Sequence, residues 1–273
     1  MLLLPAALTL PQGGGELAGA AMFGLLTLVN YQSEAKSSPA PYSKFSIAGE
    51  KESGKEARVS GRSGMLVIYA PALVAMGLIS AGTSSQIDGD RAILVNALLI
   101  AHFAKRCIET IFVHRYSGTM PLAASVGIGA YYTLVSAAIA SLRCATPQPQ
   151  AAAIGVALFV VGSLGNLYHH WLLATLRPAS SSSAPAAAAA ADRVKAYKVP
   201  SGGLFSMVAM PHYLFELVAW LGIAVASQHL NAFLVFSAMA SYLAGRSVAS
   251  SRWNAANIPN YPRDRRHLVP GIF

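Results

Sequence analysis

Long apolar stretches alternate with shorter polar connections along most of the chain. Seven of these stretches are close to the roughly 20 residues that an α-helix needs to cross a bilayer. They cover residues 16–31, 65–83, 92–114, 120–142, 151–176, 204–227 and 230–249, of which the first is the shortest. The pattern therefore predicts an all-α integral membrane protein with about seven transmembrane helices.

The composition supports this prediction. Hydrophobic residues make up 54% of the chain and charged residues only 11%, and the mean hydropathy is +0.48. This balance excludes an ordinary soluble domain. Cys107 and Cys144 both lie in apolar stretches without metal-ligand spacing, so they indicate neither a disulfide framework nor a zinc site. The opening MLLLPAALTL lacks a basic region, so we expect no removable signal peptide.

The distribution of Lys and Arg predicts the orientation. If all seven stretches cross, fifteen of the twenty Lys and Arg lie on the side of the C-terminal tail, whereas Arg91 and Arg143 lie on the other. The remaining three, Lys105, Arg106 and Arg246, lie inside spans. By the positive-inside rule the C-terminus is cytosolic and the N-terminus lumenal. The net charge of +9 thus reflects topology and does not indicate nucleic-acid binding.

Polar composition divides the chain into two parts. Residues 1–63 hold the first transmembrane segment and a polar, partly disordered cytosolic loop, in which residues 32–58 have the composition of a disordered segment. Residues 64–273 form the main membrane domain. Within it, PASSSSAPAAAAAAD at residues 178–192 is a low-complexity insertion that favours a linker.

The third span carries four ionisable residues at helical spacings of three, four and seven: His102, Lys105, Arg106 and Glu109. A Lys, Arg or Asp at the centre of a membrane helix costs roughly 2.5–3.5 kcal/mol on insertion scales, so the cluster needs partners or a ligand. One interpretation is an internally neutralised network that pairs Glu109 with Lys105 and Arg106. The other is a functional site inside the membrane.

Polar groups recur in the later spans at helical spacing. Asn166, His169 and His170 share one span, His212 and Glu216 the next, and Arg246 lies near the end of the last. From the third span onward, the cations Lys105, Arg106 and Arg246 outnumber the acids Glu109 and Glu216. A polyanionic ligand such as a nucleotide cofactor or a coenzyme A ester would complement this surplus. A basic rim in contact with lipid headgroups would give the same charge count.

Several separated motifs resemble the steroid 5α-reductase superfamily, which includes trans-2-enoyl-CoA reductases and polyprenol reductases. They are GNLYHHWLLATLR at 165–177, YKVPSGGLF at 197–205, MPHYLFELVAWLG at 210–222, and GRSVASSRW followed by NYPRDRRHLVPGIF at the end. HFAKRCIETIFVHRYSGTMPL at 102–122 extends the resemblance, which covers roughly residues 60–273. Tyr42, Lys44 and Phe45 form a weaker match upstream.

The resemblance implies a multi-pass reductase of the endoplasmic reticulum membrane, residues 64–273 being its reductase domain. Such an enzyme uses NADPH to saturate a carbon–carbon double bond conjugated to a carbonyl. It needs no Rossmann fingerprint, and GGGELAG and GIGAYY lack the spacing and setting of one. By the resemblance the cofactor-binding residues are Asn166, Arg177, Tyr197, Lys198, His212, Arg246, Arg252 and Arg265. No metal is expected.

Departures from the family pattern bear on the substrate. Animal-type steroid 5α-reductases hold the steroid ketone with a Gln-Glu pair and a Tyr, where this chain has Ile68-Tyr69 and Phe103. The string KR-x-x-ET-x-FVHR instead resembles the enoyl-CoA reductases, whose catalytic Lys and Tyr map onto Lys105 and Tyr213. Glu216 would orient or pair the basic groups. The expected substrate-binding residues are Tyr69, His102, Phe103, Arg106 and Glu109.

These features favour a reductase of very-long-chain trans-2-enoyl-CoA, with a 3-oxo-Δ4-steroid as the alternative substrate. A catalytically impaired partner in a lipid-synthesis complex is a second alternative, because Phe103 and Asn254 each stand where the family pattern has a Tyr. A di-iron oxygenase would need more histidine boxes than the single adjacent pair His169 and His170.

Overall fold

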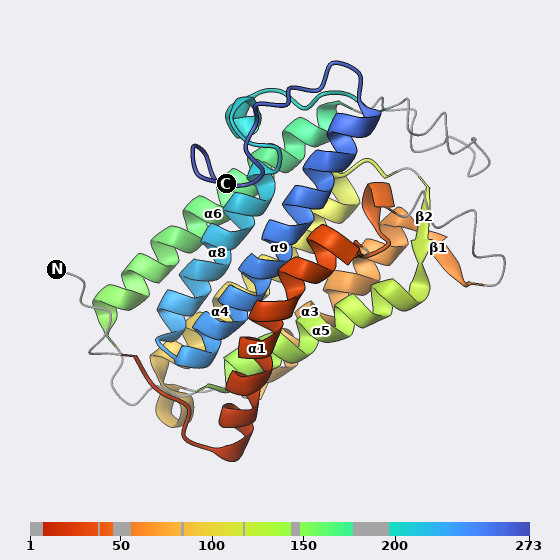
Figure 1. Ribbon diagram of the computed structural model, residues 1–273. Coiled ribbons are helices and arrows are strands. Elements are labelled where there is room, and N and C mark those ends of the chain that lie inside the picture. Colours follow the sequence, from red (N-terminus) through yellow and green to blue (C-terminus); the bar gives the residue numbers. More distant parts are fainter. Residues whose placement is uncertain are drawn as a thin grey trace.

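The computed structural model of the chain is a bundle of long helices that run up and down (Figure 1). It describes residues 8–37, 39–45, 56–82, 85–116, 118–142, 148–176 and 197–273. The predicted linker at 178–192 lies outside these residues, as do Arg143 and Cys144.

Seven long helices account for most of the described residues. They are α1 (Gly14–Gln32), α3 (Gly61–Gly82), α4 (Ser85–Ile108), α5 (Leu122–Ser141), α6 (Pro149–Thr175), α8 (Pro211–Ser227) and α9 (Leu230–Asn257). Each overlaps one of the predicted apolar stretches, because helical hydrogen bonding within a segment is what an apolar environment requires of the backbone.

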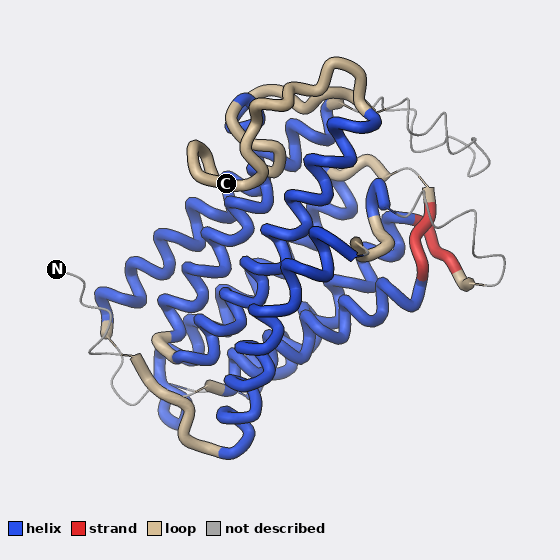
Figure 2. Tube along the Cα trace, viewed as in Figure 1, coloured by secondary structure: helices blue, strands red, loops and turns tan. Residues whose placement is uncertain are grey.

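Short elements join the long helices. They are the π-helices η2 (Ser33–Ser37) and η4 (Glu109–Val113), the 3-10 helices η3 (Ser43–Phe45) and η6 (Gly203–Ser206), and the strands β1 (Arg58–Ser60) and β2 (Thr119–Pro121). The two strands pair antiparallel with Val59 opposite Met120. Figure 2 shows them beside one end of the helical bundle.

Four helices, α3, α5, α6 and α9, are long and apolar enough to cross a membrane, whereas α8 is apolar but has 17 residues. α4 carries Arg91, Lys105 and Arg106 and bends at Gly89, where φ is +77°. The fold is therefore an all-helical membrane bundle. That all seven helices cross the membrane, and that the N-terminus is lumenal and the C-terminus cytosolic, remain predictions.

The sixth apolar stretch differs most from its prediction. The stretch begins at residue 204, but α8 begins only at Pro211, and the residues before it form the 3-10 helix η6 and a loop. Met210 has φ of −130° and ψ of 60°, outside the helical region, and Pro211 occupies the first turn of α8, so the helix begins there. Hydropathy could not detect this boundary, because the loop is as apolar as a helix. The last helix also continues to Asn257, eight residues past the predicted end.

Close packing of α6 on α8 positions much of the site. Three glycines make this approach possible: a Cβ at Gly162 would lie 2.2 Å from the Ala219 nitrogen, and one at Gly222 would lie 2.5 Å from the Gly155 carbonyl oxygen. Small residues at such an interface let two membrane helices come close enough for interhelical hydrogen bonds. α1 packs on α9 and α3 on α5 in the same up-and-down manner.

The residues after α1 fold back on α9. We call residues 33–45, without the undescribed Ser38, the N-terminal strap. Its Tyr42 hydroxyl lies 2.8 Å from the Tyr242 hydroxyl, and the Arg246 guanidinium donates to the carbonyl oxygens of Ala40 and Tyr42 at 2.8 and 3.0 Å. Disorder was predicted for residues 32–58. Within this stretch the strap is instead packed against the last helix, and residues 56–58 lead into β1.

Candidate active site

The end of α4 carries a charged triad. Lys105 and Arg106 both reach Glu109, which begins the π-helix η4: the Lys105 Nζ lies 2.9 Å from Glu109 Oε1, and the Arg106 guanidinium donates to Glu109 Oε2. Glu109 is only 1% exposed. The pairing of Glu109 with Lys105 and Arg106, one of the two interpretations of the sequence, is therefore present in the structure. The network extends beyond these three residues.

Two further helices contribute partners to the triad. Arg106 donates to the Tyr69 hydroxyl of α3 at 2.7 Å, and its guanidinium lies 4.7 Å from the centre of that ring. Lys105 donates to Asn166 Oδ1 of α6 at 2.5 Å. His170 of α6 lies 3.0 Å from Arg106 Nη1 and 3.3 Å from Glu109 Oε1 through its Nδ1. We call these residues and the triad the central cluster.

The helix α8 closes the central cluster. The Asn166 amide donates to the His212 carbonyl oxygen at 2.9 Å, and the His170 and His212 rings lie 5.3 Å apart. Glu216, one turn further, lies 3.4 Å from His102 Nε2 and accepts a hydrogen bond from the Trp220 indole at 3.2 Å. Glu216 therefore pairs with His102, while the acid that holds the two cations is Glu109.

Aromatic rings form the wall beside the central cluster. Phe103 is fully buried and contacts His102, Tyr132 and Trp220 edge to face, with ring centres 5.0–6.4 Å apart. Tyr132 also lies 5.9 Å from Tyr69. These rings pack against one another and against His102, beside the buried charges.

A second cluster lies where the N-terminal strap meets α9. Arg246 is 1% exposed and forms an ion pair of 3.1 Å with Glu34. Its guanidinium lies over the Tyr42 and Phe45 rings at 3.9 and 4.4 Å, and it interacts with the Tyr213 hydroxyl of α8. Arg246 is thus the cation beside the Tyr213 hydroxyl. Lys105, the other residue proposed for catalysis, contacts Asn166 and Glu109 instead.

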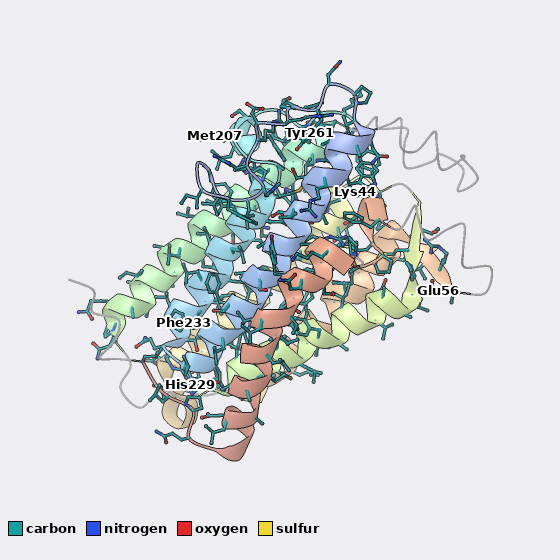
Figure 3. All side chains as sticks on the ribbon, viewed as in Figure 1. Lys44, Glu56, Met207, His229, Phe233 and Tyr261 are labelled. Atoms are coloured by element: carbon teal, nitrogen blue, oxygen red, sulfur yellow. The ribbon has the colours of Figure 1, made fainter. Side chains whose placement is uncertain are left out.

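Lys44 extends this strap cluster toward the end of α9. Its ammonium donates to Asn254 Oδ1 at 2.6 Å and to the Ser250 carbonyl oxygen at 3.3 Å, and it lies 5.2 Å from the centre of the Trp253 ring. Burial and the nearby Arg246 guanidinium lower the pKa of Lys44 to about 7. Figure 3 shows Lys44 toward the end of the bundle that carries Tyr261 and the C-terminal loop, away from His229.

His212 and Tyr213 connect the two clusters. They are neighbours in the first turn of α8, with ring centres 4.3 Å apart. His212 faces His170 of the central cluster and feels the charge of Lys44, whereas Tyr213 interacts with Arg246. The first turn of α8 therefore lies between the charged end of α4 and the strap.

The other residues predicted to bind a cofactor lie around the same end of the bundle. Arg252 donates to the Ala35 carbonyl oxygen at 3.0 Å and Arg265 to that of Pro200 at 2.8 Å. Tyr197 contacts Trp253 with ring centres 4.9 Å apart, and Lys198 is exposed. Arg177 lies outside the described residues.

NADPH is the cofactor that the resemblance implies, and the donor set fits it. Phosphates are bound by Arg and Lys donors, and several such side chains, among them Lys44, Arg246, Arg252 and Arg265, lie at this end. Among the described residues, Arg246 Nε, Arg265 Nε and His212 Nδ1 are buried without a hydrogen-bond partner. Buried donors of this kind need an acceptor, and a nucleotide supplies many.

One trio has the spacing of a metal site. The ligand atoms of Glu109, His114 and His170 all lie within 4.8 Å of one another. Glu109 already pairs with Lys105 and Arg106, and Arg106 also contacts His170. These two cations would repel a metal ion, so the electrostatics of the trio do not favour one.

Some of the residues that build the site had weak or no signal in the sequence. Glu34 lies in a polar stretch of ordinary composition, and only its ion pair with Arg246 reveals its role. Lys44 was part of the weak upstream match, but no helical spacing links it to the other polar residues. Its partner Asn254 lies 210 positions later in the chain.

The sequence was compared with a family model and with known proteins. A family model described as 3-oxo-5-alpha-steroid 4-dehydrogenase matches residues 118–273. A very-long-chain enoyl-CoA reductase of Dictyostelium discoideum is 29% identical over 178 residues, which cover 63% of this chain and 55% of that protein. A probable very-long-chain enoyl-CoA reductase of Caenorhabditis elegans is 31% identical over 183 residues, 63% of this chain and 56% of that protein. Human 3-oxo-5-alpha-steroid 4-dehydrogenase 1 is 26% identical over 189 residues, 65% of this chain and 66% of that protein.

Proposed function

The chain belongs to the 3-oxo-5-alpha-steroid 4-dehydrogenase family, and from this premise we propose that it is a membrane-embedded reductase that uses NADPH to saturate a carbon–carbon double bond conjugated to a carbonyl. The observation that carries the proposal is the convergence of Lys105, Arg106 and Glu109 with polar side chains of α3, α6 and α8 inside an apolar bundle. So many buried polar groups are costly to retain without a ligand or substrate.

The residues around the N-terminal strap and the end of α9 would hold the cofactor. Arg246, Arg252, Arg265 and Lys198 are suited to its phosphates, and Asn166 and Tyr197 to its nicotinamide and ribose. NADPH, when bound, supplies the hydride. His212, in the first turn of α8, lies between these residues and the central cluster and would orient the nicotinamide end.

Tyr213 is the proposed acid. Its hydroxyl donates a hydrogen bond to the carbonyl oxygen of the substrate and so stabilises the negative charge that develops there during reduction. Arg246, which interacts with this hydroxyl, adds positive charge at the same point. Lys105 holds further positive charge near the olefin, and Glu109 keeps Lys105 and Arg106 in fixed positions.

The substrate we favour is a very-long-chain trans-2-enoyl-CoA. Two relatives with this activity in their names support it, and so does Phe103, which offers no hydrogen bond where steroid reductases use a Tyr. Tyr69, His102, Phe103, Arg106 and Glu109 would contact the acyl end. A 3-oxo-Δ4-steroid is the alternative that the family description supports. The proposal includes a location in the endoplasmic reticulum membrane and association with other proteins of a lipid-synthesis complex.

The test is NADPH oxidation by the purified protein with an enoyl-CoA and with a 3-oxo-Δ4-steroid. We expect oxidation that depends on the enoyl-CoA, and we expect Tyr213→Phe and Lys105→Ala to lower the rate by about 10²-fold or more, the range for a lost acid or charge-stabilising group. Tyr168→Phe is the matched control, because Tyr168 is 46% exposed on the outer face of α6.

Two results would contradict parts of the proposal. Full rates in both variants would remove Tyr213 and Lys105 from the chemistry. Cofactor binding without turnover of either substrate would favour a catalytically impaired member that acts as a partner in a membrane complex.

A further inference from the structure

A small cavity lies at the end of the bundle opposite the candidate active site, the end at which Figure 3 labels His229. It measures about 120 Å³, and its lining comes from three helices, α1, α5 and α9. The lining includes Glu16, Phe23, Ile139, Leu142 and Asn231. Glu16 and Asn231 stand in the first turns of α1 and α9, and Leu142 ends α5, so the polar part of the cavity lies where these helices end.

Two hydrogen-bond acceptors of this cavity lack a donor. The Asn231 amide nitrogen donates to the Glu16 carbonyl oxygen at 2.8 Å, and a carbonyl oxygen can only accept, so Asn231 must turn its Oδ1 the other way. That oxygen is buried without a hydrogen-bond partner among the described residues. Glu16 Oε2 accepts from the Gln12 backbone N–H at 2.9 Å, which leaves Oε1 of the same carboxylate for a further donor.

The carboxylate of Glu16 also lacks a permanent counter-ion in the described part of the chain. Its ionic contact is with His229, whose Nε2 lies 3.6 Å from Glu16 Oε2. Burial and the charge of Arg91 lower the pKa of His229, against the effect of Glu16, so the imidazole is neutral at pH 7. Arg91 itself donates to carbonyl oxygens at the ends of α5 and α8. A cation that enters the cavity would therefore be stabilised by Glu16.

An apolar seam leads from the cavity along the outside of the bundle between α1 and α5. Gly19 and Ala138 line the cavity. Met22, one turn after Gly19, is 51% exposed, and Leu134, one turn before Ala138, is 71% exposed. Exposed apolar side chains of a membrane bundle contact lipid chains. The cavity and the seam together match a molecule that has a cationic donor at one end and an acyl chain at the other.

We propose that the cavity binds the ammonium group of a phosphatidylethanolamine from the bilayer, on the predicted lumenal side, with an acyl chain along the seam between α1 and α5. A primary ammonium supplies N–H donors for Glu16 Oε1 and Asn231 Oδ1 and a positive charge for the carboxylate. The headgroup of phosphatidylcholine carries the same charge but has no N–H. An anionic headgroup would be repelled by Glu16. The site lies away from the proposed reaction, so the inference does not depend on the proposed function.

The first experiment is native mass spectrometry of the full-length protein in detergent with three phospholipids that have identical acyl chains: phosphatidylethanolamine, phosphatidylcholine and phosphatidylglycerol. We expect the unmodified protein to bind phosphatidylethanolamine about tenfold to hundredfold more tightly than the other two, the range for a charged hydrogen bond. Glu16→Gln should remove this preference, because it removes the charge. Asp90→Asn is the matched control, because Asp90 is an exposed acid in the first part of α4, at the same end.

A second variant fills the cavity and leaves both acceptors in place. A Cβ at Gly19 would lie 3.5 Å from its nearest atom, which is an ordinary contact, so a longer side chain can enter the cavity. Gly19→Leu should weaken phosphatidylethanolamine binding to the level of phosphatidylcholine. Gly24→Leu is its control, because a Cβ there meets no atom within 4 Å. Thermal unfolding of each variant shows that a protein without the preference is still folded.

The inference is overturned if the unmodified protein binds the three lipids equally, or if Glu16→Gln and Gly19→Leu keep the preference. Equal binding of phosphatidylethanolamine and phosphatidylcholine, both above phosphatidylglycerol, would also overturn it. In that case charge alone would decide the binding, without N–H donation to Asn231. None of these measurements requires oxidation of NADPH, so the inference and the proposed function fail separately.

Discussion

At the scale of single residues, Glu109 determines the charge balance of the site. It is the shared partner of Lys105, Arg106 and His170, and it is 1% exposed. The spacing of three and four residues along α4 predicted its pairing with the two cations, because such spacings place side chains on one face of a helix. The contacts with Tyr69, Asn166 and His170 were not predictable from this spacing, since they come from other helices.

We predict that Glu109→Gln destabilises the folded protein by about 3–5 kcal/mol, because it leaves two buried cations without a counter-ion. Thermal or denaturant unfolding in a fixed detergent measures this change. Glu56→Gln is the control, because Glu56 is exposed next to β1. Equal stability of both variants would mean that Lys105 and Arg106 are not compensated by Glu109 in the folded protein.

At the scale of elements, the packing of α6 on α8 decides where the polar side chains meet. Asn166 and His170 project from α6, and His212 and Glu216 from α8, while Gly155, Gly162 and Gly222 allow the two backbones to approach. The sequence showed these glycines in apolar stretches but gave no partner for them. Only the structure shows that they face one another.

We predict that Gly162→Ala destabilises the protein by about 1–3 kcal/mol, the usual cost of overpacking, and lowers the rate of NADPH oxidation. The added methyl group would lie 2.2 Å from the Ala219 nitrogen and would push α8 away from α6. Gly77→Ala in α3 is the matched control, because a Cβ there meets no atom within 4 Å. The role of the close packing is disproved if both alanine variants unfold at the same temperature and are equally active.

At the scale of the whole molecule, successive long helices run in alternating directions, so their connections gather at two ends (Figure 1). The site, the N-terminal strap and the C-terminal loop lie toward one end, and His229 lies at the other (Figure 3). The charge distribution predicts that the first end faces the cytosol. A nucleotide would then reach the site directly from the cytosol.

We predict that a short epitope inserted within residues 178–192 and one at the C-terminus are both cut by protease added to sealed microsomal vesicles. An epitope at the N-terminus should be protected until detergent opens the vesicles, because seven crossings place it in the lumen. Protection of the C-terminal epitope would reverse the orientation, and exposure of all three would indicate an even number of crossings.

Hydropathy, helical spacing and short motifs were enough to predict the membrane class, the approximate positions of the seven long helices described here, the charged face of α4 and the family. These properties are local: hydropathy, helical spacing and short motifs each depend on neighbouring residues. The start of α8 was the exception, because an apolar loop and an apolar helix have the same hydropathy. The boundary lies at Met210, whose φ and ψ are not helical, directly before Pro211.

Which side chains meet depends on contacts between distant parts of the chain. Arg246 pairs with Glu34 and Lys44 with Asn254 across more than 200 residues, and Tyr213 meets Arg246 because α8 and α9 pack side by side. No local pattern encodes these contacts, since they depend on how the helices and the strap pack against one another. Losing one polar contact among the apolar helices is costly, because no water is present in the bilayer to replace the missing partner.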